Sequence, residues 1–420
     1  MRSRKPLLHI CLLLTAFALL PASGALSQAR PPVRLPASPP DSLTVYLMTM
    51  GPGQRVWERF GHNAIWIHDP VAGTDETYNY GLFDFHQENF LLRFIQGRMW
   101  YWMQGFPAQS YVDSYRRANR SVWVQELEMP PRARRELQEF LKWNERPENR
   151  FYHYDYYRDN CSTRVRDALD HALGGRIRER TQNLPTGKTY RFHTLRLTAN
   201  DPPVYTGLLL ALGHPVDRPI SAWEEMFLPL AMRDQLRKLT VVGDNGTEVP
   251  LVRSERTLFQ STDSPPPAAP PFWLPAYLVG GLAVGGAIFG LAGAARANRG
   301  ARIGFLIVTS VWVMLAGLAG LVLGGLWAFT DHAAAYNNEN VLQANLLVLP
   351  LLWLIPGSLA AASGRRRAAL MLATVVAAMA LAGLLLKLLP QFYQVNGQVI
   401  ALALPAHTGV MAALWRLARS

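Results

Sequence analysis

Two patterns of hydrophobic positions divide the chain. Residues 42–260 mix charged and apolar side chains, and apolar positions recur there at every second or at every third to fourth residue. Residues 272–415 are rich in Leu, Ala, Gly and Val and nearly free of charge. The stretch STDSPPPAAPP at 261–271 separates them, and such a Pro-rich string favours a stiff, extended linker. We therefore expect a folded domain, a linker and a membrane-embedded region.

The first region predicts an α+β domain. Alternation with period two predicts strands, and apolar residues at helical spacing predict helices. The predicted strands are 42–50, 62–68, 77–85 and 121–129, and the predicted helices are 86–104, 130–147 and 161–173. Asp159 or Asn160 supplies the N-cap of the last helix, and Gly174 with Gly175 ends it.

The second region contains five apolar segments, each near the ~20 residues that a helix needs to cross a bilayer. They lie at about 272–294, 303–329, 341–362, 368–389 and 398–415. The loops 294–302 and 363–367 and the C-terminal RLARS are basic, whereas the alternate loops carry no Lys or Arg. The positive-inside rule then predicts that the basic loops and the C-terminus are cytoplasmic and that residue 271 lies outside.

The N-terminus agrees with this orientation. MRSRKPLLHICLLLTAFALLPASGALS has a basic start, an apolar stretch and small residues near its end, which is typical of a secretory signal at 1–27. An uncleaved anchor helix is the alternative. A Pro-rich lead-in, 28–41, follows. In either case the domain at 42–260 is predicted to be exported.

Charge and cysteine content narrow the function. The chain has 42 basic and 30 acidic residues, a net charge of +12. The basic residues are scattered, and several lie between apolar segments, so no nucleic-acid partner is expected. The chain has two cysteines. Cys11 lies in the predicted signal, so Cys161 is the sole thiol of the mature chain and no internal disulfide can form.

Cys161 is the candidate nucleophile. It begins a predicted helix, where free backbone N–H groups and the helix dipole favour a thiolate and can hold an oxyanion. A small buried side chain is the alternative interpretation. Tyrosines near Cys161 could lend a hydroxyl to the oxyanion site, although a core role suits most of them. These tyrosines are Tyr154, Tyr156 and Tyr157.

A cysteine nucleophile needs a base and a group that orients that base. His62, in FGHNAIW at the start of a predicted strand, is the preferred base, with His68 and His153 as alternatives. Asn79 and Asp84, in YNYGLFDF on the predicted neighbouring strand, are the candidates to orient the imidazole, and Asn79 is preferred.

Other chemistries lack support in the sequence. The motifs of nucleotide-binding loops, zinc peptidases and serine hydrolases do not occur. A metal site from His62, His68 and Asp69 is conceivable but generic. We therefore expect neither a cofactor nor a metal.

The order of a strand histidine followed by a helix-start cysteine resembles the permuted papain or NlpC/P60-like group, which includes lecithin:retinol acyltransferase-like proteins. More closely, FGHNAIWI, YNYGLFDF and YDYYRDNCSTRVRDAL resemble the periplasmic domain of the bacterial lipoprotein N-acyltransferase Lnb family, over roughly residues 42–200. The resemblance implies a permuted papain-like domain in the periplasm, followed by a transmembrane helical bundle in the bacterial inner membrane.

The resemblance also implies an activity. Cys161 would take an acyl group from a membrane phospholipid as a thioester, with His62 as base, and pass it to an amine such as the N-terminus of a lipoprotein. The aromatic stretch at 90–106 suits a lipid-facing lip. A cell-wall peptidase or amidase and a non-enzymatic membrane scaffold remain the alternatives.

Overall fold

The computed structural model describes residues 42–84, 86, 88–243, 246–359 and 364–419. The predicted signal at 1–27 and lead-in at 28–41 lie outside these residues. The described residues belong to one unit, Ser38–Ser420.

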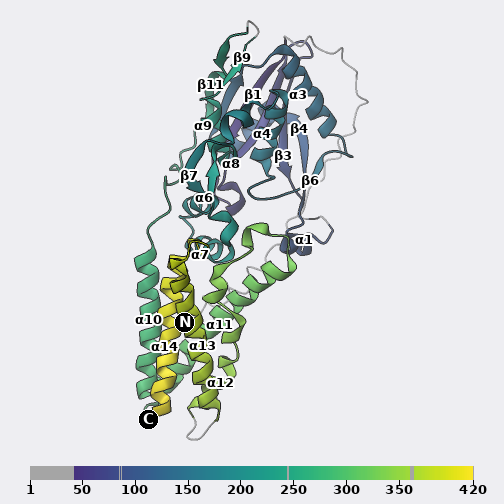
Figure 1. The fold of residues 1–420 in the computed structure, drawn as a ribbon. Helices are drawn as coiled ribbons and strands as arrows, with labels where there is room; N and C mark the ends of the chain where they lie inside the picture. The colour runs from purple at the N-terminus through teal and green to yellow at the C-terminus, as the bar shows by residue number, and fades with distance from the viewer. Residues whose placement is uncertain (1–41, 85, 87, 244–245, 360–363, 420) are drawn as a thin grey trace. The chain divides into compact units, whose positions relative to one another are not determined.

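An antiparallel sheet of seven strands forms the centre of the first region (Figure 1). Its order is β11-β5-β1-β2-β3-β4-β6, and each neighbouring pair is antiparallel. The strands are β1 (Thr44–Met50), β2 (His62–Asp69), β3 (Thr74–Leu82), β4 (Trp100–Pro107), β5 (Val122–Leu127), β6 (Phe151–His153) and β11 (Val252–Phe259).

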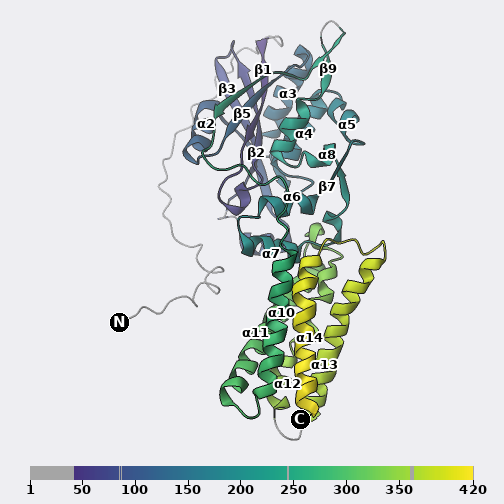
Figure 2. The same ribbon diagram turned by 90° about the vertical axis from the view of Figure 1, so that its left-hand side faces the viewer.

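Helices cover both faces of this sheet (Figure 2). Because side chains alternate along a strand, each face has its own core. Helices α3 (Pro131–Asn144) and α4 (Cys161–Ala172) cover one face, where Leu47, Ile65 and Leu169 are buried together. Helix α2 (Ala108–Arg117) covers the other face, in contact with Met48, Ala64 and Val124. The sheet is therefore the middle layer of a three-layer α+β domain.

The predicted helix at 86–104 is wrong over its second half. Helix α1 spans only Phe90–Gln96, and Gly97 ends it in the left-handed conformation with φ +73°. The chain then enters β4, where Met103 lies in the core while Trp102 faces the opposite side. An aromatic-rich strand and an aromatic-rich helix look alike in sequence when the strand is short.

The segment between α4 and β11 is a set of short elements without a motif in sequence. They are α5 (Arg176–Thr181), β7 (Pro185–Thr189), α6 (Tyr190–Leu197), α7 (Pro202–Ala211), β8 (Pro219–Ser221), α8 (Ala222–Glu225), α9 (Pro229–Leu236), β9 (Thr240–Val242) and β10 (Glu248–Pro250).

The second region is helical. Within the described residues, four helices are long and apolar enough to cross a membrane. They are α10 (Leu274–Ala294), α11 (Arg299–Phe329), α13 (Gly364–Leu385) and α14 (Gly397–Arg419). Helix α14 packs against α10 and α13 (Figures 1 and 2). Glycines allow this approach, because a Cβ on Gly409 would lie 2.3 Å from the Cα of Gly285.

The third predicted span, 341–362, is not one straight helix. Its described part forms a pair of pieces, Glu339–Val348 and α12 (Leu351–Ser358), bent by 57°. Counting that pair as one span gives five. Irregular backbone packs closely on α11 here, since a Cβ on Gly320 would lie 2.4 Å from the Cα of Asn345. Such backbone is tolerated at membrane depth where protein covers it.

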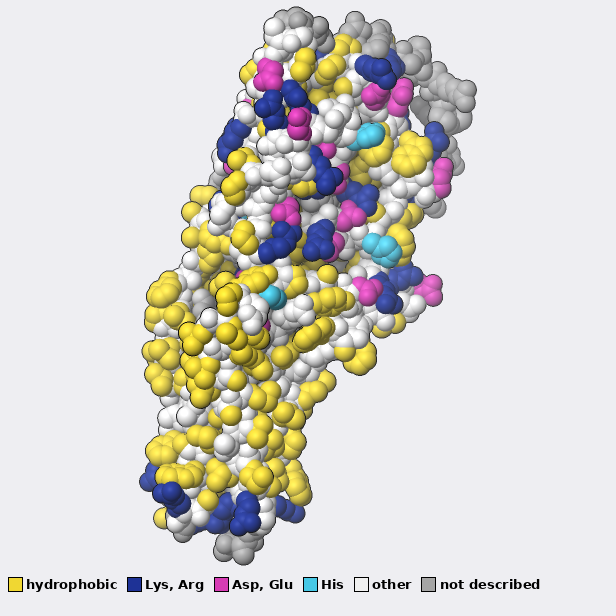
Figure 3. All heavy atoms as spheres, viewed as in Figure 1, with side chains coloured by type: hydrophobic (Ala, Val, Ile, Leu, Met, Phe, Trp, Pro, Cys, Tyr) yellow, Lys and Arg dark blue, Asp and Glu magenta, His cyan; other side chains and the backbone are white. Residues whose placement is uncertain are grey.

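Basic side chains gather at one end of the helical region, beyond a belt of exposed apolar side chains (Figure 3). The arginines of the two basic loops and of the C-terminus form this group. They are Arg296, Arg299, Arg302, Arg365, Arg366, Arg367, Arg416 and Arg419.

At the other end of the helical region, the segment that follows α11 binds the last turn of α7. The Asn338 side chain donates to the carbonyls of Leu210 and Ala211, at 2.8 and 3.1 Å. The Asn340 side chain donates to those of Leu209 and Leu210, at 3.1 and 2.9 Å. These carbonyls have no partner within their own helix. We call this contact the α7 junction.

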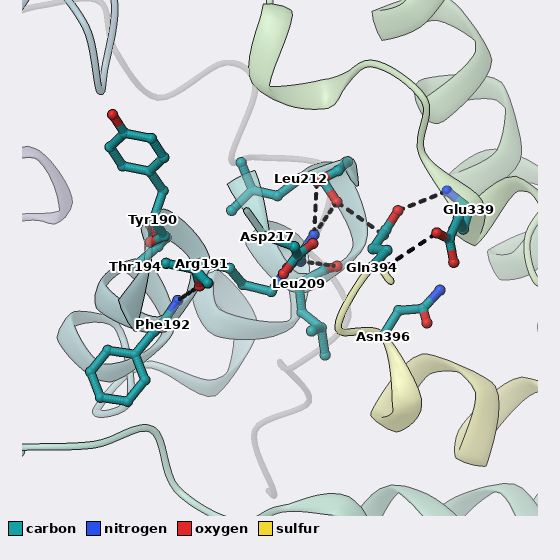
Figure 4. Close-up of polar contacts among 12 residues, drawn as sticks. Tyr190, Arg191, Phe192, Thr194, Leu209, Leu212, Asp217, Glu339, Gln394 and Asn396 are labelled. Carbon is teal, nitrogen blue, oxygen red and sulfur yellow. Dashed lines mark hydrogen bonds and ion pairs between the residues drawn. The ribbon is translucent and has the colours of Figure 1, made fainter. Parts of the chain in front are cut away.

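A buried arginine completes the α7 junction (Figure 4). Arg191 is 1% exposed, and its Nε donates to the Asp217 carboxylate at 2.7 Å. Its Nη1 donates to the Leu209 carbonyl, and its Nη2 to the carbonyls of Leu212 and Gly213. Gln394, from the loop before α14, donates to the same Leu212 carbonyl at 3.2 Å. The junction thus ties the sheet domain to the helical region through hydrogen bonds that use every nitrogen of the Arg191 guanidinium group.

Candidate functional site

Cys161 is the first residue of α4, and its position is fixed by the residue before it. The Asn160 side chain accepts from the backbone N–H groups of Ser162 and Thr163, both at 2.9 Å. Thr163 Oγ1 accepts in return from the Asn160 N–H at 2.7 Å. Asn160, and not Asp159, is therefore the N-cap, and this reciprocal pair is a capping box. The Asn160 amide also donates to the carbonyl of Phe227, which fastens the start of α4.

His62 and Asn79 meet on the neighbouring strands β2 and β3. His62 Nε2 lies 2.6 Å from Asn79 Oδ1. An amide oxygen only accepts, so Nε2 carries the proton and Nδ1 keeps a lone pair. Asn79 is buried and lies opposite Ala64 in the register of the two strands. This arrangement fixes both the tautomer and the direction of the ring.

Gly81 lies between the cysteine and the histidine. A Cβ at this position would lie 3.2 Å from Cys161 Cβ and 3.6 Å from His62 Cε1, so the two side chains are neighbours. Gly81 has φ +97°, and the register of β3 with β4 shifts beside it. A bulge of this kind suits glycine, because its backbone can adopt a positive φ and approach a neighbour closely.

Burial sets the protonation of the pair. It raises the pKa of the Cys161 thiol to about 11, although backbone N–H groups of Asn63, Ser162 and Cys161 itself act in the opposite direction. Burial likewise lowers the pKa of His62 to about 4, although the hydrogen bond to Asn79 opposes this shift. Burial therefore opposes the thiolate that the helix terminus favours, and at neutral pH it favours a thiol beside a neutral imidazole.

Two groups near this pair were not found in sequence. Arg120 is 6% exposed, and its charge acts on both members, favouring the thiolate of Cys161 and the neutral form of His62. Its Nε donates to the Gly51 carbonyl at 2.9 Å, whereas its Nη2 is buried without a hydrogen-bond partner among the described residues. Nothing in the surrounding sequence distinguishes this arginine from the many others.

Tyr152 is the second such group. It is 5% exposed, and its hydroxyl lies 4.0 Å from the Cβ position of Gly81, close to Cys161. That hydroxyl also lacks a hydrogen-bond partner within the described part of the chain. An unpartnered buried hydroxyl costs free energy, which a ligand can offset by accepting from it.

The alternatives to His62 and Asn79 lie elsewhere. His68 bonds Asp75 at the far end of β2, at 2.9 Å. His153 packs on Trp100, with ring centroids 4.0 Å apart. Asp84 accepts from the backbone and the ring of His86. None of these three side chains has a described contact with Cys161.

Of the three tyrosines suggested as hydroxyl donors, Tyr154 lies near Cys161. Burial and, after it, the charge of an ionised Cys161 raise the pKa of Tyr154, as they raise that of Tyr152. Tyr156 is exposed, and the Tyr157 hydroxyl pairs with Thr194. Tyr152, two positions before the suggested group, is a further tyrosine whose hydroxyl lies near the site.

No group of three His, Cys, Asp or Glu side chains that could hold a metal ion occurs in the described ranges. The arrangement is a thiol, a neutral imidazole with a free lone pair, and several hydrogen-bond donors around them. It is suited to general-base attack of sulfur on a carbonyl group.

Comparison with known families gave two matches. A family model described as the Lnb N-terminal periplasmic domain matches residues 33–200. A second model, described as the Lnb transmembrane domain, matches residues 287–416. Together they cover well over half of the chain. Comparison with curated proteins and with solved structures gave no match.

Proposed function

Because this chain belongs to the Lnb family, we propose that it is a cysteine-dependent acyltransferase that acylates the N-terminal amine of lipoproteins. Its sheet domain is periplasmic and its helical region is transmembrane, as the two family descriptions state. The observation that carries the proposal is the adjacency of Cys161, at the start of α4, to the His62–Asn79 pair across Gly81.

The first half-reaction forms a thioester. The sulfur of Cys161 attacks the ester carbonyl carbon of a phospholipid while the thiol proton moves to Nδ1 of His62. Because burial raises the pKa of the thiol, we expect proton transfer to accompany attack instead of preceding it. The C–O bond then breaks, and the imidazolium returns its proton to the departing alkoxide of the lysophospholipid.

The second half-reaction releases the acyl group. The acceptor amine attacks the thioester carbonyl, a C–N bond forms, and the C–S bond breaks to regenerate Cys161. His62 takes a proton from the amine and returns one to the sulfur, so the site ends as it began.

Donors around the sulfur stabilise the oxyanion of both steps. The backbone N–H groups of Asn63 and Cys161 and the unpartnered Tyr152 hydroxyl are the candidates. The Arg120 guanidinium adds a positive charge at a point where negative charge develops in the transition state. We also propose that the fold is papain-like and permuted, because the strand with the histidine precedes the helix with the cysteine in the chain.

Topology supports a periplasmic site. Asp331, just beyond the C-terminal end of α11, pairs with Arg98 of the sheet domain at 2.6 Å. The end of α11 near Asp331 therefore lies on the side of the periplasmic domain. The basic end of the helical region, including Arg416 and Arg419, would then lie in the cytoplasm of the cell with the C-terminus.

Intact-mass analysis of the detergent-solubilised protein mixed with phospholipid tests the proposal. We expect a fatty-acyl adduct on Cys161 that hydroxylamine removes, and no adduct on a Cys161→Ala variant of equal thermal stability. A protein that forms no adduct but cleaves cell-wall peptides would be a hydrolase. A Cys161→Ala variant with full cellular activity would indicate a scaffold.

A further inference from the structure

Helix α1 exposes several large apolar side chains within one short helix. Four of its seven residues are large, apolar and about half exposed. These are Leu91 at 59%, Leu92 at 54%, Phe94 at 48% and Ile95 at 53%. A contiguous exposed apolar surface on a helix marks contact with a partner or with a membrane.

Contacts between α1 and the end of α11 indicate that the apolar surface of α1 meets a membrane. The backbone N–H of Asp331 donates to the Gln96 carbonyl at 2.8 Å, and His332 Nε2 lies 3.1 Å from the Phe94 carbonyl. Asp331 follows the end of α11 by two residues, and Phe329 there is 80% exposed. The apolar surface of α1 is thus joined to the apolar surface of a membrane-spanning helix, at the end where that helix leaves the bilayer.

An open pocket of about 580 Å³ lies beside α1. It is lined by Asp84, Arg93, Trp100, Trp102, Arg150 and Phe151. The aromatic members come from β4 and β6, two strands that pair Trp102 with Phe151. Tryptophan, which supplies two of these three rings, is enriched at the level of lipid headgroups, because its ring system is largely apolar and carries one polar N–H group.

The charge of the pocket matches one phosphodiester. Two guanidinium groups and one carboxylate leave a net charge of one positive unit. Among the described residues neither Arg93 nor Arg150 forms an ion pair, and Arg150 Nε is buried without a hydrogen-bond partner. Arg150 also lies over the ring of Phe151, with its Cζ 5.0 Å from the ring centroid. Arginine is suited to bidentate binding of phosphate.

From this geometry we propose that α1 inserts its apolar side chains into the outer leaflet of the inner membrane, and that the pocket binds the phosphate of one phospholipid headgroup through Arg93 and Arg150. This lipid is distinct from the acyl donor in its location. None of the side chains that line the pocket belongs to the group placed around Cys161, and Phe151 of the pocket and Tyr152 of the site, neighbours on β6, face opposite sides of the sheet. The bound lipid holds the edge strand at a fixed depth.

Depth-dependent fluorescence quenching tests the insertion of α1. The full-length protein, with Cys11 and Cys161 replaced by Ser and Ala, receives one cysteine for a fluorophore, either by Leu92→Cys or by Val242→Cys. Val242, on β9, is exposed to a similar extent, 47%. In nanodiscs with spin-labelled lipids we expect strong quenching at position 92 and at most a background level at 242. Equal quenching at the two positions would overturn the insertion.

A phospholipid with a photoreactive group close to its phosphate tests the pocket. We expect cross-links to peptides from β4 and β6, and at least about a fivefold loss in the double variant Arg93→Gln, Arg150→Gln, because each charge-assisted bond is lost. Arg146→Gln, an exposed arginine on the neighbouring loop, serves as the control. Unchanged cross-linking in the double variant contradicts the site. Competition by millimolar inorganic phosphate would identify a free-anion site instead.

Discussion

Arg120 and Arg191 are both almost fully buried, but they differ in how many of their nitrogen atoms have a hydrogen-bond partner. At the α7 junction every nitrogen of Arg191 has a hydrogen-bond partner. Near Cys161, Nη2 of Arg120 and the Tyr152 hydroxyl have none among the described residues. A saturated network fixes structure, whereas unpartnered donors around a nucleophile lower the free energy of a ligand that supplies the missing acceptor. We therefore call the groups around Arg191 the structural cluster and the groups around Cys161 the chemical cluster.

Replacing His62 by Gln is the change with the largest expected effect on the chemical cluster. We expect the rate of acyl transfer to fall roughly 10³-fold, because the general base is lost while the hydrogen bond to Asn79 can persist. Single-turnover formation of the acyl adduct, followed by mass, measures it. An unchanged rate would remove His62 from the mechanism.

Arg191→Met acts on the structural cluster. It leaves the Asp217 carboxylate buried and unpaired, so we expect a loss of about 3–5 kcal/mol of folding stability. Thermal inactivation in detergent reports it, with Arg158→Met as the exposed control. If the variant is as stable as the control, the junction does not hold the domain in the manner described.

Arg120→Gln distinguishes the two arginines most directly. We expect a rate loss of roughly 10- to 100-fold, which is the order of magnitude for losing one unit charge near the negative charge of the transition state at an effective dielectric constant near 20. We also expect a higher pKa of the Cys161 thiol. Arg120→Lys keeps the charge and should recover most of the rate. The pH dependence of alkylation of Cys161 measures the thiol pKa, and an unaltered value would assign Arg120 to packing alone.

A methyl group at Gly81 tests the close approach of sulfur and imidazole. Gly81→Ala and Gly73→Ala both place alanine at a positive φ, with a cost of about 1 kcal/mol each. Only at Gly81 does the new Cβ meet Cys161, since nothing lies within 4 Å at Gly73. We expect at least tenfold slower transfer in Gly81→Ala alone. Equal rates in the two variants would count against the geometry.

The last expected effect is on the pH dependence of stability. Because His62 has a pKa of about 4 in the folded protein and about 6.5 when unfolded, the unfolded state binds more protons between these values. Stability is therefore lost as pH falls through this window, by up to about 1.4 kcal/mol per pH unit. His62→Gln should flatten the decline between pH 6.5 and pH 4.5 in thermal unfolding. Transfer activity of the unaltered protein should persist to about pH 5.

The fold was predictable where local patterns decide it. Alternation in HNAIWIH and helical spacing after Cys161 both correspond to elements of the structure. The structure of the stretch at 86–104 was not predicted correctly, because the pairing of β4 with β3 outweighs the helical appearance of its sequence. The bend in the apolar segment at 341–362 was not predicted either. Hydropathy depends on composition alone, whereas the bend depends on close packing against α11 at Gly320.

For the candidate site, the nearness of Cys161, His62 and Asn79 was predictable from the sequence, whereas the groups around them were not. Cys161 and His62 stand in short, recognisable contexts, and the nearness of Asn79 follows from strand pairing. Arg120 and Tyr152 contribute through burial, which no local motif encodes. Burial also raises the pKa of the Cys161 thiol, which opposes the effect expected from the helix terminus, and burial depends on the whole fold.

The α7 junction has a consequence for how the protein is made. The carbonyls at the end of α7 are covered by Asn338, Asn340 and Gln394, which are translated more than a hundred residues later. While the chain is still being exported, these carbonyl groups can accept hydrogen bonds only from water or from a chaperone. Folding at the end of α7 is then completed only when the last helices of the protein are in place.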